Sequence, residues 1–297
     1  MTQAAQRRTT QRPARSSQHS RHHEPGGEAQ SRARILLRLA VAGGLGFIYV
    51  PLLVVLVNSF NTSRTFAWPP SGFTLEWWGR TAVSEGVLSA LWTSVKAGLG
   101  ATAIALVLGT MAAFAVQRYR FFGRDTVSFL VILPIALPGI ITGIALANTF
   151  RAVLGPTGIT LGLATVIIGH ATFCIVVVYN NVLARLRRTG TSLEEASADL
   201  GADTFQTFRM VTLPTVRSAL FAGGLLAFAL SFDEIIVTTF TASPGVQTLP
   251  IWIFGNLFRP NQAPVVNVVA AALIVLSFVP VWLAARLGVG ESAGGRL

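Results

Sequence analysis

The sequence predicts an all-helical membrane protein with six transmembrane helices and both termini in the cytoplasm. Three observations lead to this fold class. Hydrophobic residues make up 52% of the chain and charged residues only 12%, whereas soluble proteins carry about a quarter charged residues. Six apolar stretches are long enough to cross a bilayer. The arginines alternate between rich and poor segments along the chain.

The six apolar stretches each supply the roughly 20 helical residues that span a hydrocarbon core. They cover residues 35–57, 91–116, 126–148, 159–183, 219–240 and 265–287. The mean hydropathy of the chain, +0.60, agrees with several membrane-spanning segments.

Arginine placement orients these helices, because basic residues in short loops stay on the cytoplasmic side. The arginine-poor loops hold Arg64, Arg80, Arg151 and Arg259. The intervening segments hold the cluster from Arg7 to Arg38 and then Arg118, Arg120, Arg124, Arg185, Arg187, Arg188, Arg209, Arg217, Arg286 and Arg296. Both termini and the segment 190–214 are therefore expected in the cytoplasm. The net charge of +11 follows this topology and does not predict nucleic-acid binding.

The chain divides into five parts. Residues 1–34 are basic and nearly free of apolar residues, which predicts a disordered cytoplasmic tail. Residues 35–58 form a first transmembrane anchor, whose full length and long polar lead argue against a cleavable signal peptide. An extracytoplasmic loop at 59–87, the main membrane domain at 88–287 and a cytoplasmic tail at 288–297 complete the division.

Two of the spans carry unusual residues. In the third span, Pro134, Pro138, Gly139 and Gly143 predict a kink, because proline removes a backbone hydrogen bond and glycine permits close helix packing. In the fourth span, His170 is far in sequence from the other histidines. We interpret it as a hydrogen-bonded interior residue, with a proton relay as the alternative.

The segment 190–214 is polar and lies between two long apolar stretches. Ser192-x-x-Glu195 and Asp203-x-x-Gln206 are capping-box patterns, so two short helices are expected. Gly201 fits the turn between them, because glycine adopts the left-handed conformation at little steric cost.

This segment resembles the E-A-A loop of permease subunits of ATP-binding-cassette importers. Glu195-Ala196-Ser197 is followed by Gly201 and then by Val211-Thr212-Leu213-Pro214 with the spacing of that family, which usually has alanine at Ser197 and isoleucine at Val211. The resemblance implies the type I importer permease fold. It assigns coupling to a cytoplasmic ATPase to Glu194, Glu195, Ala196, Ser197, Gly201, Leu213 and Pro214. The alternative is a solvated loop that merely joins two spans.

Two acidic residues, Asp233 and Glu234, lie inside the fifth predicted span. A charged carboxylate near the bilayer centre costs about 2.5–3.5 kcal/mol, so such residues generally face a cavity, a partner charge or a substrate. A continuous helix would place Asp233 about 24 Å beyond Arg217, in the outer half of the membrane. Neighbours on a helix point about 100° apart, so only one carboxylate can face a narrow passage squarely. We take Asp233, Glu234 and Thr238 as candidates for a solute path, with a structural ion pair or hydrogen bond as the alternative.

The same region is similar to the second permease subunit of spermidine/putrescine importers. The similarity rests on Ser231-Phe232-Asp233-Glu234 and Thr248-Leu249-Pro250 and extends over residues 88–287. It implies a polyamine such as spermidine or putrescine as the solute, and an acidic lining is chemically consistent with a polycation. Related permeases for ferric iron, thiamine and phosphonates share the fold, so the substrate stays open.

The chain lacks the residues of an ATPase or a metalloenzyme. Its single lysine, Lys96, does not follow a glycine-rich phosphate-binding loop. Cys174 is the only cysteine, and three of the four histidines lie in the first 23 residues, so no zinc site is expected. We expect no catalytic residue, metal or cofactor in this chain. ATP and Mg²⁺ would bind to the partner ATPase.

The expected function is that of a multi-pass permease subunit in a bacterial inner membrane. Its implied partners are a second permease subunit, an ATPase dimer, an extracytoplasmic solute-binding protein and the lipid bilayer. Trp68, Trp77, Trp78 and Trp92 fit either an interfacial belt or docking of the binding protein. The alternative function is an ion-coupled secondary transporter that uses Asp233, Glu234 and His170. A membrane enzyme, the third hypothesis, would need a cluster of catalytic residues that the sequence does not contain.

Overall fold

The structure of the chain is a computed structural model that describes residues 27–66, 68–259 and 261–292. Within these ranges it consists of helices, turns and loops without a β-strand, and one isolated bridge joins Asn61 and Phe73. The chain divides into two units, one up to Pro51 and one from Leu52 onward. The predicted all-helical class is confirmed for the described residues.

Helix α1 (Gly27–Asn58) supplies the described part of the first unit. It begins earlier than the predicted span at 35–57. Its stretch Arg34–Asn58 is long and apolar enough to cross a membrane, which agrees with that predicted span. Residues 1–26 of the predicted basic tail, with three of the histidines, lie outside the described residues, as do residues 293–297.

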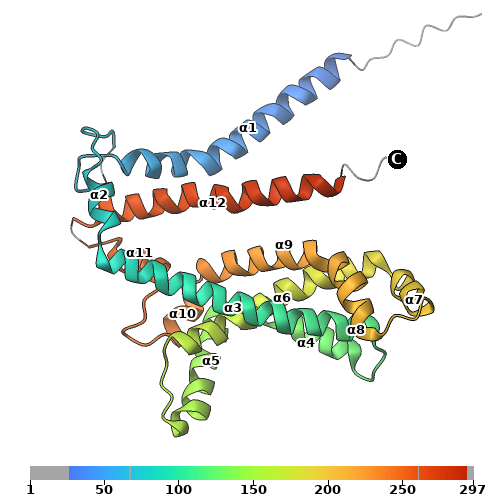
Figure 1. Cartoon of the computed structure of the whole chain (residues 1–297). Helices are drawn as coiled ribbons and strands as arrows, with labels where there is room; N and C mark the ends of the chain where they lie inside the picture. Colours follow the sequence, from blue (N-terminus) through green and yellow to red (C-terminus); the bar gives the residue numbers. More distant parts are fainter. Residues whose placement is uncertain (1–26, 67, 260, 293–297) are drawn as a thin grey trace, which may run out of the picture. The chain divides into compact units, whose positions relative to one another are not determined.

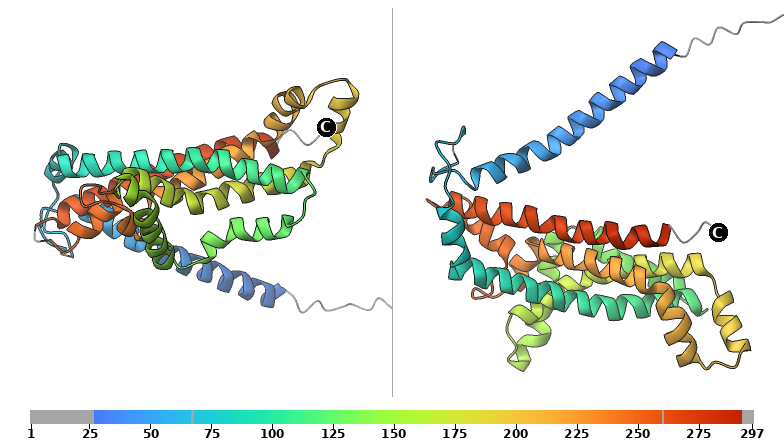
Figure 2. Two further views of the ribbon diagram at one scale, coloured as in Figure 1. Left: turned by 90° about the horizontal axis from the view of Figure 1, so that it is seen from below. Right: turned by 45° about the horizontal axis from the view of Figure 1, so that its top comes forward.

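Helices α3 (Glu85–Arg118), α6 (Leu163–Thr189) and α9 (Leu213–Phe232) pack against one another and form the centre of the second unit (Figures 1 and 2). Small buried residues recur on α3 at a spacing of four, namely Ala97, Ala101, Ala105, Gly109 and Ala113. A Cβ atom at Gly109 would lie 2.8 Å from the carbonyl oxygen of Ile175 on α6, which is too close for a real side chain. Small residues of this kind let membrane helices approach closely and gain van der Waals contact.

The third predicted span consists of two helices, α4 (Arg124–Ala136) and α5 (Gly139–Leu154), which are bent by 107° at the break between them (Figure 1). Pro138 explains the break, because proline lacks the N–H that a continuing helix needs and disfavours the helical conformation of the residue before it. Leu137 is accordingly extended, with a ψ angle of 143°. The predicted kink is confirmed, but a single helix over 126–148 is wrong.

The fifth predicted span, 219–240, is also wrong as a single helix. Helix α9 ends at Phe232, and α10 (Ile236–Thr241) begins after residues 233–235. Helix α10 packs against α5 and α6 at two glycines, since a Cβ at Gly143 would lie 2.7 Å from the Phe240 ring and one at Gly169 would lie 3.2 Å from Val237. The β-branched run over 235–239 favours helix only weakly, so this packing rather than helix propensity sets the direction of α10.

Two further helices, α11 (Leu249–Asn256) and α12 (Ala263–Ser292), form a second apolar cluster with the start of α3. Helix α2 (Glu76–Ala82) packs against α12. The hydroxyl of Ser94 on α3 accepts a hydrogen bond of 2.8 Å from the Leu249 N–H at the beginning of α11. This bond connects segments 155 residues apart.

The tryptophans of the segment 59–87 differ in burial. Trp77 is 6% exposed and its indole N–H donates to the Asn61 carbonyl at 3.0 Å. Trp78 stacks on Phe60 with ring centroids 5.5 Å apart. Trp68, in the same segment, and Trp92, after it, are both more than half exposed. Packing within the segment therefore uses two of the four rings.

Four helices among the described residues are long and apolar enough to cross a membrane, and the bent α4–α5 pair raises the number to five. Helix α12 adds a shorter apolar stretch, Ala263–Ser277. The described part of the chain is thus an all-helical protein with several candidate spans.

Candidate functional site

The segment between α6 and α9 forms two short helices that protrude at one end of the core bundle (Figures 1 and 2). Helix α7 spans Ser192–Asp199 and helix α8 spans Thr204–Thr207. Gly201 lies in the turn between them with a φ angle of 85°, the left-handed conformation that glycine adopts without a steric penalty. The predicted helix-turn-helix is confirmed.

One of the two predicted capping boxes is present. The Gln206 N–H donates to Asp203 Oδ1 at 2.8 Å, and the Asp203 N–H donates to Gln206 Oε1 at 3.0 Å. The box predicted at Ser192 and Glu195 is wrong, because the N-cap residue of α7 is Thr191. Glu195 instead accepts a 2.6 Å hydrogen bond from the Thr191 hydroxyl. The N-cap of α7 is therefore Thr191, one residue before the predicted N-cap Ser192.

Helix α8 does not end before the fifth span. It continues through a π-helical turn, Phe208–Thr212 (η2), directly into α9, so that Thr204–Phe232 is helical without a gap, with a bend between α8 and α9 (Figure 1). A wider turn here fits Pro214, because a proline ring collides with the carbonyl four residues earlier in a regular helix. Leu213 and Pro214 are the first two residues of α9. Any displacement of α8 therefore acts on α9 without an intervening loop.

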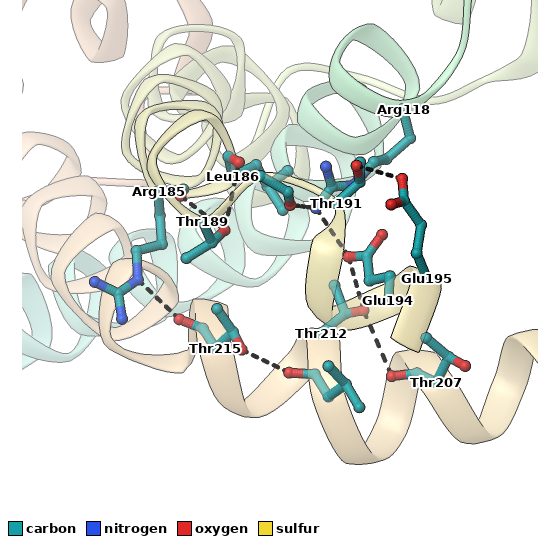
Figure 3. Close-up of polar contacts among 12 residues, drawn as sticks. Arg118, Arg185, Leu186, Thr189, Thr191, Glu194, Glu195, Thr207, Thr212 and Thr215 are labelled. Atoms are coloured by element: carbon teal, nitrogen blue, oxygen red, sulfur yellow. Dashed lines mark hydrogen bonds and ion pairs between the residues drawn. The ribbon is translucent and has the colours of Figure 1, made fainter. Parts of the chain in front are cut away.

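Glu194 is the residue that joins this segment to the bundle (Figure 3). Its Oε1 atom accepts from Arg118 Nη2 at 2.9 Å and from the Thr212 hydroxyl at 3.0 Å. The same Arg118 Nη2 donates to the Gly190 carbonyl at 2.9 Å. The side chains of Arg118 and Glu194 are only 13% and 24% exposed. The ion pair thus connects the end of α3, the first turn of α7 and the π-helical turn.

Other residues of the predicted coupling set lie on the outside of the segment. Glu195 and Ala196 are exposed, and Ser197, where the resembling family usually has alanine, shares a 3.1 Å hydrogen bond between its hydroxyl and that of Thr207. Large apolar side chains are also uncovered, with Leu200 at 90%, Phe205 at 68% and Met210 at 72% exposure. The segment therefore carries a large amount of exposed apolar surface.

A groove of about 1180 Å³ runs from this segment along α3 and α9. Met111, Phe114 and Phe221 form part of its apolar wall, and Glu195 and Arg217 lie at its polar end. The groove therefore joins the protruding segment to the surface of the bundle.

The second group of predicted site residues lies at the break between α9 and α10. Helix α9 has one buried stripe, with Gly223, Ala227 and Ser231, and one exposed stripe. The exposed stripe runs through Ala222, Leu226 and Ala229 and ends at Asp233, the C-cap residue. Asp233 is therefore presented on the open face of the helix.

Glu234 and Thr238 are used differently. Glu234 is half-buried and its Oε1 accepts from the Val237 N–H at 2.8 Å, which satisfies a free donor in the first turn of α10. The Thr238 side chain has no exposed surface, and its hydroxyl donates to the Glu234 carbonyl at 2.9 Å. The carboxylates of Asp233 and Glu234 thus have different environments, as predicted. The reason is the break between α9 and α10, and not the 100° rotation between neighbours on one continuous helix.

His170 lies behind this break and is completely buried. Its Nδ1 atom is 2.7 Å from the Ser231 hydroxyl, and its Nε2 atom is 2.8 Å from the Thr238 hydroxyl. The prediction of a hydrogen-bonded interior histidine is confirmed. Among the described residues, no group of three His, Cys, Asp or Glu side chains could hold a metal ion.

Sequence reasoning missed two parts of these sites, Arg118 and the hydroxyls of Thr212 and Ser231. In the sequence, Arg118 indicates only the cytoplasmic side of the membrane, because its partner Glu194 lies 76 residues further along the chain. The available signal was the predicted topology, which puts Arg118 and the E-A-A pattern on the same, cytoplasmic side. The Ser231–His170 contact spans 61 residues and left no signal in the sequence.

Residues 105–288 match the protein family described as "Binding-protein-dependent transport system inner membrane component". This match covers more than half of the chain. A solved structure, described as a bacterial ABC transporter involved in the import of the acidic polysaccharide alginate, aligns with a TM-score of 0.65 over 88% of this chain and 96% of that chain. Its sequence identity is 17%, so it supports the fold alone.

Curated relatives extend the similarity beyond the matched segment. The putrescine transport system permease protein PotI of Escherichia coli K12 is 33% identical over 82% of this chain and 88% of its own length. The spermidine/putrescine transport system permease protein PotC of the same strain is 34% identical over 79% and 87%. The putative 2-aminoethylphosphonate transport system permease protein PhnV of Salmonella typhi is 30% identical over 82% and 92%. The chain therefore belongs to the family of binding-protein-dependent transport system inner membrane components, as an ABC permease subunit that carries solute and catalyses no reaction of its own.

Proposed function

We propose that this protein is the permease subunit of a bacterial inner-membrane importer that takes up a polyamine and is driven by a separate ATPase. It would form the solute passage together with a second permease subunit. An extracytoplasmic solute-binding protein would deliver the polyamine, and a dimer of cytoplasmic ATPase subunits would bind ATP and Mg²⁺. The family to which the chain belongs supports these partners, because its description names both a binding protein and the inner membrane.

The proposed topology has six spans with both termini in the cytoplasm. The spans would be α1, α3, the α4–α5 pair, α6, the α9–α10 pair and α12. An even number of spans returns the chain to the side on which it starts. The arginine-rich segments then lie in the cytoplasm, together with α7 and α8, as the positive-inside rule requires.

Coupling to the ATPase would occur through α7 and α8. The observation that carries this proposal is the unbroken helical segment Thr204–Phe232, which runs from the protruding segment to the last residue before Asp233. Exposed Leu200 and Phe205 would pack into a cleft of the ATPase, while Glu195, Ala196, Ser197 and Gly201 shape the docking helix. Glu194, Leu213 and Pro214 would pass the movement to the bundle. Closure of the ATPase dimer would then rock the helices between inward-open and outward-open states.

A polyamine is the solute best supported. The printed names of PotI and PotC give putrescine and spermidine for those proteins, and each matches about four-fifths of this chain. The exposed carboxylate of Asp233 favours a cationic solute, and Glu234 and Thr238 would shape the break that presents it. PhnV, at 30% identity, is named for 2-aminoethylphosphonate, and competition between this anion and putrescine for uptake tests the charge preference.

An ion-coupled transporter has less support, because both ring nitrogens of His170 and Oε1 of Glu234 take part in hydrogen bonds that hold the break. A reconstituted importer separates the two functions. Proteoliposomes that contain this chain, its second permease, the ATPase and the binding protein should accumulate radiolabelled putrescine only with ATP. Uptake by this chain alone, driven by a proton gradient without ATP, would contradict the proposal.

A further inference from the structure

The side chain of His170 bridges the break between α9 and α10. His170 extends from α6 and contacts Ser231, in the last turn of α9, and Thr238, in the first turns of α10. All three side chains are at most 2% exposed. Only residues 233–235 separate the two helices, so the imidazole holds both ends of the segment that contains Asp233.

The directions of these hydrogen bonds follow from the available hydrogens. The Thr238 hydroxyl has one hydrogen, which it donates to the Glu234 carbonyl at 2.9 Å. With that hydrogen on the Glu234 carbonyl, the Thr238 oxygen is an acceptor for His170, and we assign the ring hydrogen to Nε2. The Nδ1 atom is then the acceptor, and the Ser231 hydroxyl donates to it. One continuous chain of directed bonds runs from α9 through the imidazole to the backbone of the break.

Packing of α10 alone would leave the backbone of residues 233–235 less constrained. The contacts of α10 at Gly143 and Gly169 fix its distance from α5 and α6 but place no directional bond on residues 233–235. The imidazole adds one on each side of the break. Removal of either hydroxyl or of the ring would leave a buried polar group without its partner, which costs more than the bond itself contributes.

We propose that His170 is a positioning residue for Asp233: it holds the two helix ends so that the Asp233 carboxylate stays on the open face of α9. This inference rests on the proposed role of Asp233 in the solute passage. His170 would not touch the solute, because its side chain is completely buried. Its effect on transport would pass through Asp233.

The test uses the complete importer in proteoliposomes, with putrescine as the solute and uptake expressed per assembled complex and per ATP hydrolysed. D233N should lower putrescine uptake about tenfold, the effect of losing one contact of about 1.4 kcal/mol. H170A should lower uptake to a similar extent while ATP hydrolysis per complex is retained. The double variant H170A/D233N should be no worse than D233N alone, because both changes remove the same positioned carboxylate.

Three further variants separate positioning from packing. T238V keeps the shape of the side chain but removes the acceptor of the imidazole N–H, and it should reproduce the loss of H170A. H170Q, whose amide can still donate to Thr238, should retain more uptake than H170A. C174A removes a buried side chain one turn further along α6 and should change putrescine transported per ATP by less than twofold, because Cys174 contacts α9 at the Ala227 carbonyl, before the break.

The outcomes are distinguishable. Unchanged uptake by D233N would refute the lining role of Asp233 and with it the proposed function of this site. If D233N and H170A each lower putrescine uptake and the double variant shows the product of the two losses, only the positioning role of His170 is refuted. If H170A fails to assemble, T238V in the same cycle with D233N decides the matter, since its volume is conserved.

Discussion

Glu194 and Glu195 are adjacent in the sequence but have different environments. Glu194 is bonded to Arg118 and Thr212, and Glu195 is exposed and bonded to Thr191. The side chains of Glu194 and Arg118 are 24% and 13% exposed, so solvent screens their attraction only in part. The pair is intermediate between a surface ion pair and a fully buried one. The stability of the end of α3 therefore depends on the residue that precedes the E-A-A triplet.

Replacement of Glu194 by alanine should lower the free energy of unfolding by about 2 kcal/mol, because Arg118 would remain largely buried without its carboxylate. Unfolding of the purified subunit in detergent by an SDS titration measures this change. The matched control is E195A, which removes an exposed carboxylate and should change stability by less than about 0.5 kcal/mol. Equal losses in the two variants would contradict the distinction drawn from the hydrogen bonds.

Gly201 is constrained by its backbone rather than by its neighbours. Its φ angle is 85°, and no atom lies within 4 Å of a Cβ built at this position. G201A should cost about 1 kcal/mol from the left-handed conformation alone and raise the rate of proteolytic cleavage in the loop about fivefold. G201N is the control, because asparagine tolerates this conformation better, and its cleavage rate should stay closer to that of the natural chain. A larger effect of asparagine than of alanine would show that space, not conformation, is limiting.

At the scale of helices, the contact of α3 with α6 depends on the absence of side chains. The Cβ of alanine at Gly109 would lie 2.8 Å from the Ile175 carbonyl, while at Gly224 the nearest atom would be a Leu106 methyl at 3.5 Å, an ordinary contact. The backbone at Ile175 cannot move aside as the end of a flexible side chain can.

G109A should therefore destabilise the subunit by about 1–3 kcal/mol through overpacking, despite the higher helix propensity of alanine. G224A should be neutral or stabilise it by up to about 1 kcal/mol. The same SDS titration compares the two. Stabilisation by G109A would mean that α3 and α6 lie further apart than the structure places them.

The two broken spans differ in how far their breaks could be predicted. The break of the third span follows from local chemistry at Pro138, so a kink was expected, and only its size of 107° was not. The break after Phe232 has no proline or glycine within it. It depends on Glu234 turning back to the Val237 N–H and on hydroxyl contacts with His170, which are formed by a helix more than 60 residues away in sequence.

For the whole molecule, the proposed topology can be tested by labelling. In a C174A background, a single cysteine at Leu200 should react with a membrane-impermeant maleimide only in inverted vesicles. A single cysteine at Phe73 should react from the outside of intact spheroplasts, since both side chains are well exposed. Reaction of both positions from the same side would contradict an odd number of spans between them and the assignment of α7 to the cytoplasm.

The helical class and the several long apolar segments are encoded by composition, and the sequence alone predicts them. Apolar content, span length and helix class depend on each residue and its near neighbours, and so do the turn at Gly201 and the capping box at Asp203. The family resemblance in the E-A-A pattern is likewise local, because its spacing is read within one segment. These features needed no knowledge of which helices meet.

The tertiary structure was needed to assign Glu194 to Arg118, to end α9 at Phe232 and to join His170 with Ser231 and Thr238. Each of these depends on atoms brought within hydrogen-bonding distance from segments at least 18 residues apart or on the docking of α10 between two other helices. Such contacts form because a buried polar group must find a partner wherever the fold supplies one. Hydrophobic periodicity and motif spacing do not indicate which distant residue becomes the partner of a buried polar group.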